Sequence, residues 1–172
     1  MVYRRPDQLH LVVLSPFGTT MMEAYVLGER ITLVYPSQMT AYSGRFDELP
    51  EKGGLQGWRM IRWVMYSEPA DNKLLNETIE RMGKLGFMEK VTFENGLITS
   101  KTSPAGDHVY YGKYSVINGV PLAIDLEVRN SLDERVRLTL DEPEVNTHLD
   151  DAAFIPKLEG FTVLPLSAIQ ML

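Results

Sequence analysis

The chain has 172 residues and a mass of 19.5 kDa, which is the length of one ordinary domain and enough to enclose a sizeable core or a cavity. The formal net charge is −6 at neutral pH, so the basic excess with which proteins neutralise phosphates is missing, and nucleic acid is not expected as a partner. There is no cysteine, which excludes disulfides, thiol nucleophiles and thiolate metal sites from these residues. No apolar run approaches the roughly 20 residues that a membrane-spanning helix requires.

The first part of the chain is predicted to be an antiparallel meander, because short apolar runs alternate with turn residues. The sequence Ser15-Pro16-Phe17-Gly18 has proline and glycine where a type I turn prefers them. Gly28 supplies the positive φ of a two-residue hairpin. Strands are expected at residues 9–14, 19–27, 30–35 and 38–43. They follow one another too closely for crossover helices, which favours antiparallel pairing.

A helix is predicted at residues 55–66, since Trp58, Ile61 and Met65 recur at helical spacing. The preceding loop, residues 46–54, contains a proline and two glycines. This helix is well placed to cover one face of the predicted sheet.

A second helix is predicted after Asp71, which can cap it. Leu75, Ile79 and Met82 form an apolar stripe, and Gly86 stands where such a helix would stop. Together the two helices would form a lid.

The β pattern resumes after this region. Asn95-Gly96 and Asn118-Gly119 predict two type I′ hairpin turns. Apolar and polar residues alternate in 122–128 and 136–140, so each of these strands has one apolar face. The chain is therefore predicted to be mainly β (α+β), a single domain 1–172 with one antiparallel sheet of roughly eight to ten strands and helices inserted mid-chain. A sheet this long curls, and the helices would cover its concave face.

Catalysis is not expected from this sequence. His10, His108 and His148 have no neighbour that completes a metal-binding or general-base pattern, so surface or strand-pair roles are predicted. Asp150-Asp151 are interpreted as a solvated turn or a helix cap. An acid pair built from distant strands would escape recognition by spacing. We predict no catalytic residue, no metal and no cofactor, and thus no enzyme.

Phe17 is the most informative single residue. A tight turn places its third residue at the tip of a hairpin, where a polar side chain is usual. Turn chemistry leaves two alternatives open. The ring folds back onto its own sheet or lid, or it projects and touches a membrane or an acyl chain.

Residues 9–20 (LHLVVLSPFGTT), 28–33 (GERITL) and 42–44 (YSG) resemble the LolA/LolB lipoprotein-carrier superfamily, and most closely its outer-membrane receptors of the LolB type. Residues 144–154 are similar to the closing portion of LolA-like carriers. The likeness is specific over about residues 3–66, and beyond them it concerns only the order of strands and helices.

The resemblance implies an incomplete β-barrel, lidded by helices, whose apolar interior holds the acyl chains of lipoproteins and passes lipoproteins to the outer membrane. In LolB-type receptors the bulky residue of the Pro-x-Gly turn projects and is needed for membrane insertion. The matching loop here is Pro16, Phe17 and Gly18, with an aromatic in place of the usual leucine. The implied partners are acylated lipoproteins or lipids, the outer-membrane surface and a LolA-type periplasmic carrier.

Family members begin with a leader, a helix and about two strands that this sequence does not contain. On that basis we expect a periplasmic or outer-membrane location, with a leader missing from these residues. Without the resemblance, the absence of a leader would favour the cytosol.

Strand alternation and helical spacing select the residues of the expected concave face and its lid. They are Leu9, Leu11, Val13, Met22, Ala24, Val26, Ile31, Leu33, Trp58, Ile61, Met65, Leu122, Ile124, Leu126, Val136 and Leu138. In a lipid carrier they line a cavity, whereas in a filled sandwich they are ordinary core. The methionines of these segments allow the same two interpretations, an adaptable wall or core filling: Met21, Met22, Met39, Met60 and Met65. Two rival functions remain: a periplasmic carrier of free lipid or glycolipid, and a non-enzymatic sensory or scaffold module of the same fold.

Overall fold

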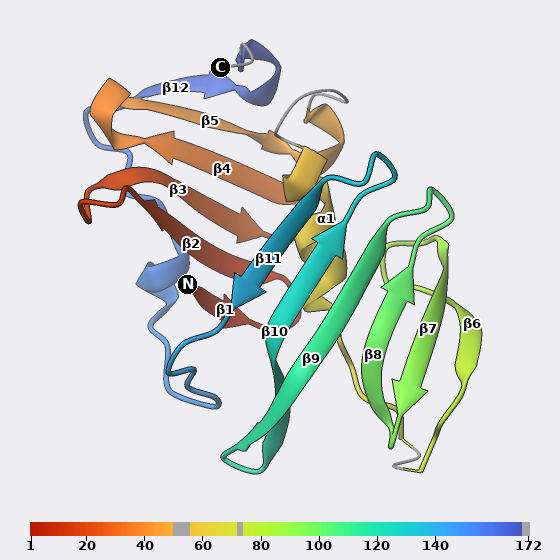
Figure 1. Cartoon of the computed structure of the whole chain (residues 1–172). Coiled ribbons are helices and arrows are strands. Elements are labelled where there is room, and N and C mark those ends of the chain that lie inside the picture. Colours follow the sequence, from red (N-terminus) through yellow and green to blue (C-terminus); the bar gives the residue numbers. More distant parts are fainter. Residues whose placement is uncertain (50–55, 72–73, 170–172) are drawn as a thin grey trace. The chain divides into compact units, whose positions relative to one another are not determined.

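The computed structural model describes residues 1–49, 56–71 and 74–169, and the chain is mainly β, as predicted (Figure 1). The strands form two six-stranded sheets, so the prediction of one sheet was wrong. The chain divides into two compact units: unit 1 is Met1–Arg62 with His148–Leu172, and unit 2 is Trp63–Thr147. The expectation of a single domain stays a prediction.

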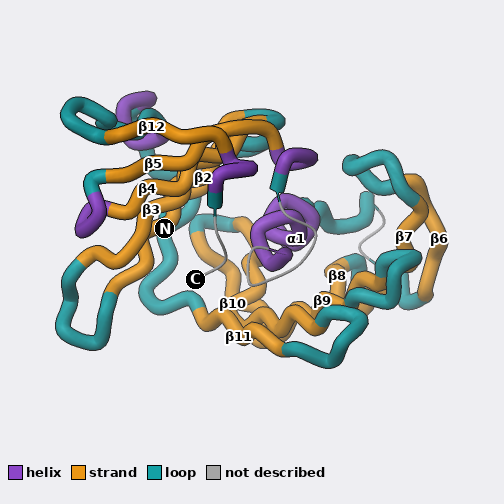
Figure 2. Tube along the Cα trace, turned by 90° about the horizontal axis from the view of Figure 1, so that it is seen from above, coloured by secondary structure: helices purple, strands orange, loops and turns teal. Residues whose placement is uncertain are grey.

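Unit 1 contains the predicted meander, and its strands lie in the order β1-β2-β3-β4-β5-β12 (Figure 1, Figure 2). Their bounds are β1 Val2–Arg4, β2 Gln8–Leu14, β3 Thr20–Leu27, β4 Arg30–Tyr35, β5 Thr40–Arg45 and β12 Thr162–Pro165. Gly28 has a positive φ, as predicted, and the Gly18 N–H donates to the Ser15 carbonyl, which closes the turn expected there. Short 3-10 helices at Pro36–Gln38 and Phe46–Glu48 flank β5.

The pair β5–β12 is parallel, so the prediction of an entirely antiparallel sheet was also wrong. The spacing argument concerned strands that follow one another in the meander, and those are antiparallel. Strand β12 reaches β5 from the far end of the chain, so the length of the connection does not prevent parallel pairing.

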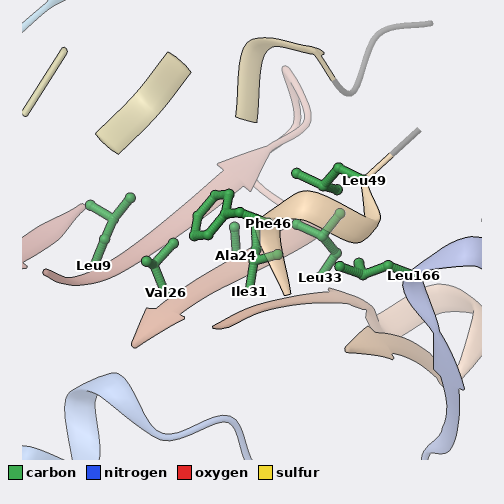
Figure 3. Packing of buried hydrophobic residues seen from close by; sticks show 8 residues of the cluster. All are labelled: Leu9, Ala24, Val26, Ile31, Leu33, Phe46, Leu49 and Leu166. Atoms are coloured by element: carbon green, nitrogen blue, oxygen red, sulfur yellow. The ribbon is translucent and has the colours of Figure 1, made fainter. Parts of the chain in front are cut away.

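The strand residues of unit 1 that were predicted to line the concave face do share one face of its sheet, as the register shows. Leu9 lies opposite Val26, Val13 opposite Met22, and Ala24 opposite Leu33. The core of the unit forms on this face (Figure 3), and its buried members are Leu9, Ala24, Val26, Ile31, Leu33, Phe46, Leu49 and Leu166.

Gly44 of β5 pairs with Ile31 of β4, and other segments of the protein pack very close to its Cα atom. A Cβ added at Gly44 would collide with the Glu48 carboxylate and lie 3.1 Å from Leu166. We expect Gly44→Ala to lower the free energy of unfolding by about 1–3 kcal/mol, measured by urea denaturation. The control is Gly112→Ala, whose Cβ would come no closer than 3.7 Å to the Asp125 carbonyl oxygen. Equal losses in the two variants would show that close packing at Gly44 is not the cause.

Helix α1, Gln56–Met65, confirms the first predicted helix within residues 56–65, while Leu55 lies outside the described residues. It is the one α-helix in the described part of the chain. The second predicted helix is wrong, because Thr78–Met82 is strand β6. Ile79 is half-buried and Met82 is exposed, because residues three apart in a strand point to opposite faces, so the expected apolar stripe does not form.

The backbone of the loop before β6 is hydrogen-bonded to the hairpin between β7 and β8. The Ala70 N–H donates to the Gly96 carbonyl, and the Gly96 N–H donates to the Leu75 carbonyl. Gly86, expected to end the helix, has a φ of +81° in the turn between β6 and β7. These long-range hydrogen bonds override the local helical pattern.

The sheet of unit 2 is antiparallel throughout, in the order β11-β10-β9-β8-β7-β6. The further strands are β7 Met88–Glu94, β8 Leu97–Thr102, β9 His108–Ile117, β10 Val120–Arg129 and β11 Arg135–Thr139. Both Asn-Gly pairs have positive φ at each residue, as the predicted type I′ turns require.

Candidate functional site

The hairpin between β2 and β3 ends in a turn that holds its aromatic residue outward. The Gly18 N–H donates to the Ser15 carbonyl at 2.9 Å, and the Ser15 N–H donates to the Thr19 carbonyl at 2.8 Å. The Ser15 hydroxyl also accepts hydrogen bonds from the Phe17 and Thr19 N–H groups. The backbone is thereby fixed, while Phe17 is 93% exposed. Of the two alternatives for this ring, the structure has the projecting one.

Two more apolar side chains accompany Phe17. Leu14 and Met21 are each more than half exposed, and we call the three residues Leu14, Phe17 and Met21 the apolar tip. Residues 11–22 contain no charged side chain. Exposed apolar groups gathered without charges are typical of surfaces that contact lipid or a partner.

Burial along the inner face of unit 1 decreases toward this tip. Leu9 and Val26, far from the turn, are buried, whereas Leu11, Val13 and Met22 are half-buried. Strands β2 and β3 therefore carry buried core residues at one end and partly exposed apolar residues at the end near the turn. An acyl chain could contact the open part, which lies on the strand ends that adjoin the turn with Phe17.

Helix α1 contributes the predicted lid residues. Trp58 and Ile61 pack against the core of unit 1, and Met65 is half-buried. Trp58 is thus a partly buried residue in contact with the apolar core.

The strand candidates of unit 2 also share one face, as the register of β10 with β9 and β11 requires. Leu126 is buried, and Leu122 and Ile124 are half-buried. Val136 is 63% exposed and Leu138 is 37% exposed. Ala123, which alternation assigns to the other face of β10, is also buried, and all residues of β11 are exposed.

A buried charged cluster in unit 2 was not predicted. The Glu89 carboxylate accepts hydrogen bonds from Trp63 Nε1 at 2.6 Å and Arg81 Nε at 2.9 Å, and Lys101 Nζ lies 3.2 Å from it. Lys101 Nζ also donates to the Trp63 and Tyr66 carbonyls, at 2.8 and 3.0 Å. The ammonium group therefore satisfies carbonyls at the carboxyl end of α1, which have no partner within the helix.

The environment shifts the pKa of both ions. Burial lowers the pKa of Lys101 from 10.5 to about 8, and the nearby Glu89 charge opposes this shift. Burial alone would raise the pKa of Glu89, but the Trp63 hydrogen bond and the Lys101 charge outweigh it and lower the pKa. Because all its polar contacts are within unit 2, we interpret the cluster as a structural anchor for the end of α1.

One signal could have revealed half of this cluster. Glu89 alternates with Val91 and Phe93 in β7, which places it on the core face. Lys101 was hidden by a bulge, since Thr92 pairs with Ser100 and Phe93 pairs with Ile98. The extra residue, Thr99, turns Ile98 and Lys101 to the same face despite their odd spacing.

The histidines and the aspartate pair have the roles that were expected. His10 stacks on its cross-strand partner Tyr25, with ring centroids 4.1 Å apart, and its Nε2 lies 3.1 Å from Glu23 Oε2. Burial and the bonded Glu23 carboxylate raise the pKa of Tyr25. The Asp150 carboxylate caps the 3-10 helix Asp151–Phe154. Within residues 1–49, 56–71 and 74–169, no group of three or more His, Asp or Glu could hold a metal ion.

The likeness to lipoprotein carriers depends on the quoted residues alone. No protein-family model matches the chain, and no curated protein matches it. The family therefore stays a prediction, and the chemistry of the site has to be inferred from its own residues. No helix in the described residues has both the length and the apolar character needed to span a bilayer.

Proposed function

We propose that this protein binds the acyl chains of lipoproteins on the apolar face of an incomplete β-barrel and transfers lipoproteins to the outer membrane. The finer fold, with α1 as a lid over that face, is part of the proposal. So is a location in the periplasm or at the periplasmic face of the outer membrane.

The observation that carries the proposal is the continuity of apolar surface in unit 1. The half-buried Leu11, Val13 and Met22 lead without an intervening charge to the apolar tip. Burial of an acyl chain is worth about 0.8 kcal/mol per methylene, so such a surface binds a long chain without directional contacts or catalytic groups.

The fixed turn supports the delivery step. Phe17 projects from a backbone held by several hydrogen bonds, so its ring can enter a bilayer without first unfolding the hairpin. An aromatic side chain is favoured at the interface between headgroups and hydrocarbon. The same tip would release an acyl chain from the adjoining face into the membrane.

The packing of α1 supports the lid. Trp58 and Ile61 are only partly buried where they meet the core of unit 1, so the helix covers apolar surface without closing into a fully packed interior. A carrier has to give up its ligand, which favours partial over complete packing.

The experiment is mass spectrometry of lipid that stays with the protein when it is purified without detergent. We expect diacylated or triacylated lipoprotein, at a level that falls at least about fivefold in Val13→Asp, which places a charge on the open apolar face. Val116→Asp, on an exposed residue of unit 2, is the control and should retain the wild-type level.

Each other outcome opposes the proposal in a defined way. Free phospholipid or glycolipid without lipoprotein would identify the rival carrier. No bound lipid, even after incubation with acylated lipoprotein, would favour the sensory or scaffold module.

A further inference from the structure

Three connections of unit 1 meet at one end of its sheet: residues 15–19, 36–39 and 158–161. Strand β4 ends and β5 begins there, since Tyr35 pairs with Thr40. The parallel strand β12 begins at the same end, because Thr162 also pairs with Thr40 and its N–H donates to the Met39 carbonyl at 2.9 Å. In both views the connections 36–39 and 158–161 lie at the same end of this sheet as the turn of the β2–β3 hairpin (Figure 1, Figure 2).

Charged side chains are segregated away from this end. Residues 11–22, 31–44 and 160–169 contain no Asp, Glu, Lys, Arg or His. Lys157 comes just before the third connection, and the exposed Glu159 lies within it, directly before Gly160. We call the end formed by residues 14–21, 36–40 and 160–162 the uncharged end.

The opposite end of the same sheet is rich in ion pairs. Arg62 pairs with Glu29 at 2.8 Å, and Arg45 pairs with Asp47 at 3.1 Å. Arg30 lies opposite Arg45 where β4 and β5 meet this end. The ion pairs of this sheet that involve its connections thus lie at the end opposite the turn with Phe17.

Besides the apolar tip, the uncharged end has a second exposed apolar side chain, Met39, which lies on a different loop from Phe17. It has a φ of 47° and ψ of 39°, a left-handed conformation that glycine or asparagine adopts at lower cost. Its N–H donates to the Pro36 carbonyl at 3.1 Å, and its side chain is 48% exposed. Met39 therefore places an apolar thioether at a position where a small or polar residue would be usual on a surface in water.

Apart from Glu159, the polar groups around these apolar residues are neutral. They are Ser15, Thr19, Thr20, Ser37, Gln38 and Thr40. Hydroxyl and amide groups can bond to lipid headgroups, and a chain with a net charge of −6 and no basic residue in these loops gains nothing from an anionic surface.

We propose that the whole uncharged end of unit 1 docks on a neutral, zwitterionic bilayer, with Met39 entering beside the apolar tip. Two insertion points on separate loops fix the orientation of the sheet, with its strands pointing end-on at the membrane. The inference rests on the proposed delivery function. It adds a second membrane contact, the orientation of the sheet on the membrane and the class of lipid surface.

The test is flotation of the whole chain with phosphatidylcholine vesicles. Met39→Glu should lower the partition coefficient at least about fivefold, since it replaces an inserting apolar side chain with a charge. The matched control is Leu27→Glu, at the charged end of β3, because Leu27 is 51% exposed and Met39 is 48% exposed. This control should bind within about twofold of wild type. Urea denaturation should give the same midpoint for all three proteins.

Several results would overturn the inference. Wild-type binding by Met39→Glu, while Phe17→Glu loses binding, would leave a single contact and spare the proposed function. Equal losses of vesicle binding in Met39→Glu and Leu27→Glu would refute the proposed end-on orientation. Binding that requires phosphatidylglycerol would refute the neutral surface. Failure of the proposed function itself is detected separately, by the absence of bound acyl lipid from the purified protein.

Discussion

Replacing Lys101 with methionine is expected to lower the free energy of unfolding by about 3 kcal/mol at neutral pH. The variant leaves the Glu89 carboxylate, whose side chain is 2% exposed, without its ammonium partner. It also leaves the Trp63 and Tyr66 carbonyls without a donor. Arg81 and the Trp63 indole still contact Glu89, which keeps the loss below the upper range for a broken buried pair.

A double-mutant cycle makes this measurement specific. Adding Glu89→Gln to Lys101→Met removes the unpaired charge, so the double variant should be more stable than the sum of the two single losses indicates. Strict additivity in urea denaturation would show that the two groups do not interact.

The same variant tests the pKa of Lys101. The value of about 8 lies below the ordinary 10.5, so between these pH values the unfolded chain binds a proton that the folded chain has released. Stability then rises with pH, by about 1.4 kcal/mol per pH unit at most and on the order of 2–3 kcal/mol over the window. Lys101→Met lacks this rise.

The difference between wild type and Lys101→Met is the quantity to follow. Burial raises the pKa of Tyr114 to about 12 and also raises the pKa of Tyr111, and such tyrosines make stability fall above about pH 10. Both proteins share that effect, so it cancels. A difference that stays constant from pH 7 to pH 10 would refute the lowered pKa.

Phe17→Glu is expected to slow lipoprotein delivery to vesicles at least about tenfold, because a carboxylate at the tip cannot enter the hydrocarbon region. The fold should be unaffected, within about 0.5 kcal/mol, since an exposed side chain contributes little to packing. Transfer of a labelled, acylated lipoprotein to phosphatidylcholine vesicles gives the rate.

Two variants serve as controls for this result. Phe17→Leu keeps an apolar tip and should deliver at near the wild-type rate. Leu27→Glu adds the same charge at the other end of β3 and should also deliver normally. Normal delivery by Phe17→Glu would remove the role assigned to the projecting ring.

Local chemistry determined what could be predicted of the fold. Pro16, Gly18 and Gly28 define turns through their own backbone preferences, so the meander was predicted almost to the residue. The second helix failed although Ile79 and Met82 have helical spacing, because the segment pairs with β7 and the loop before it is hydrogen-bonded to a distant hairpin. The parallel strand β12 is a long-range pairing for which the sequence has no local signal.

The candidate site was predictable in the same uneven way. Alternation identified the apolar faces of both sheets, but it did not indicate that Val136 would be exposed while Ile31 would be fully buried. Turn chemistry placed Phe17 at a tip without deciding its direction. The uncharged end of unit 1 was not predicted, because it depends on which loops the register brings together.

The most direct test of acyl-chain binding uses Trp58, which packs against the core of unit 1. A lipopeptide with brominated acyl chains quenches tryptophan emission only on close approach. We predict saturable quenching in the wild type that is largely lost in Trp58→Phe, which retains Trp63 as a reference. No saturable quenching by the lipopeptide, or undiminished quenching in Trp58→Phe, would contradict binding of acyl chains at this face.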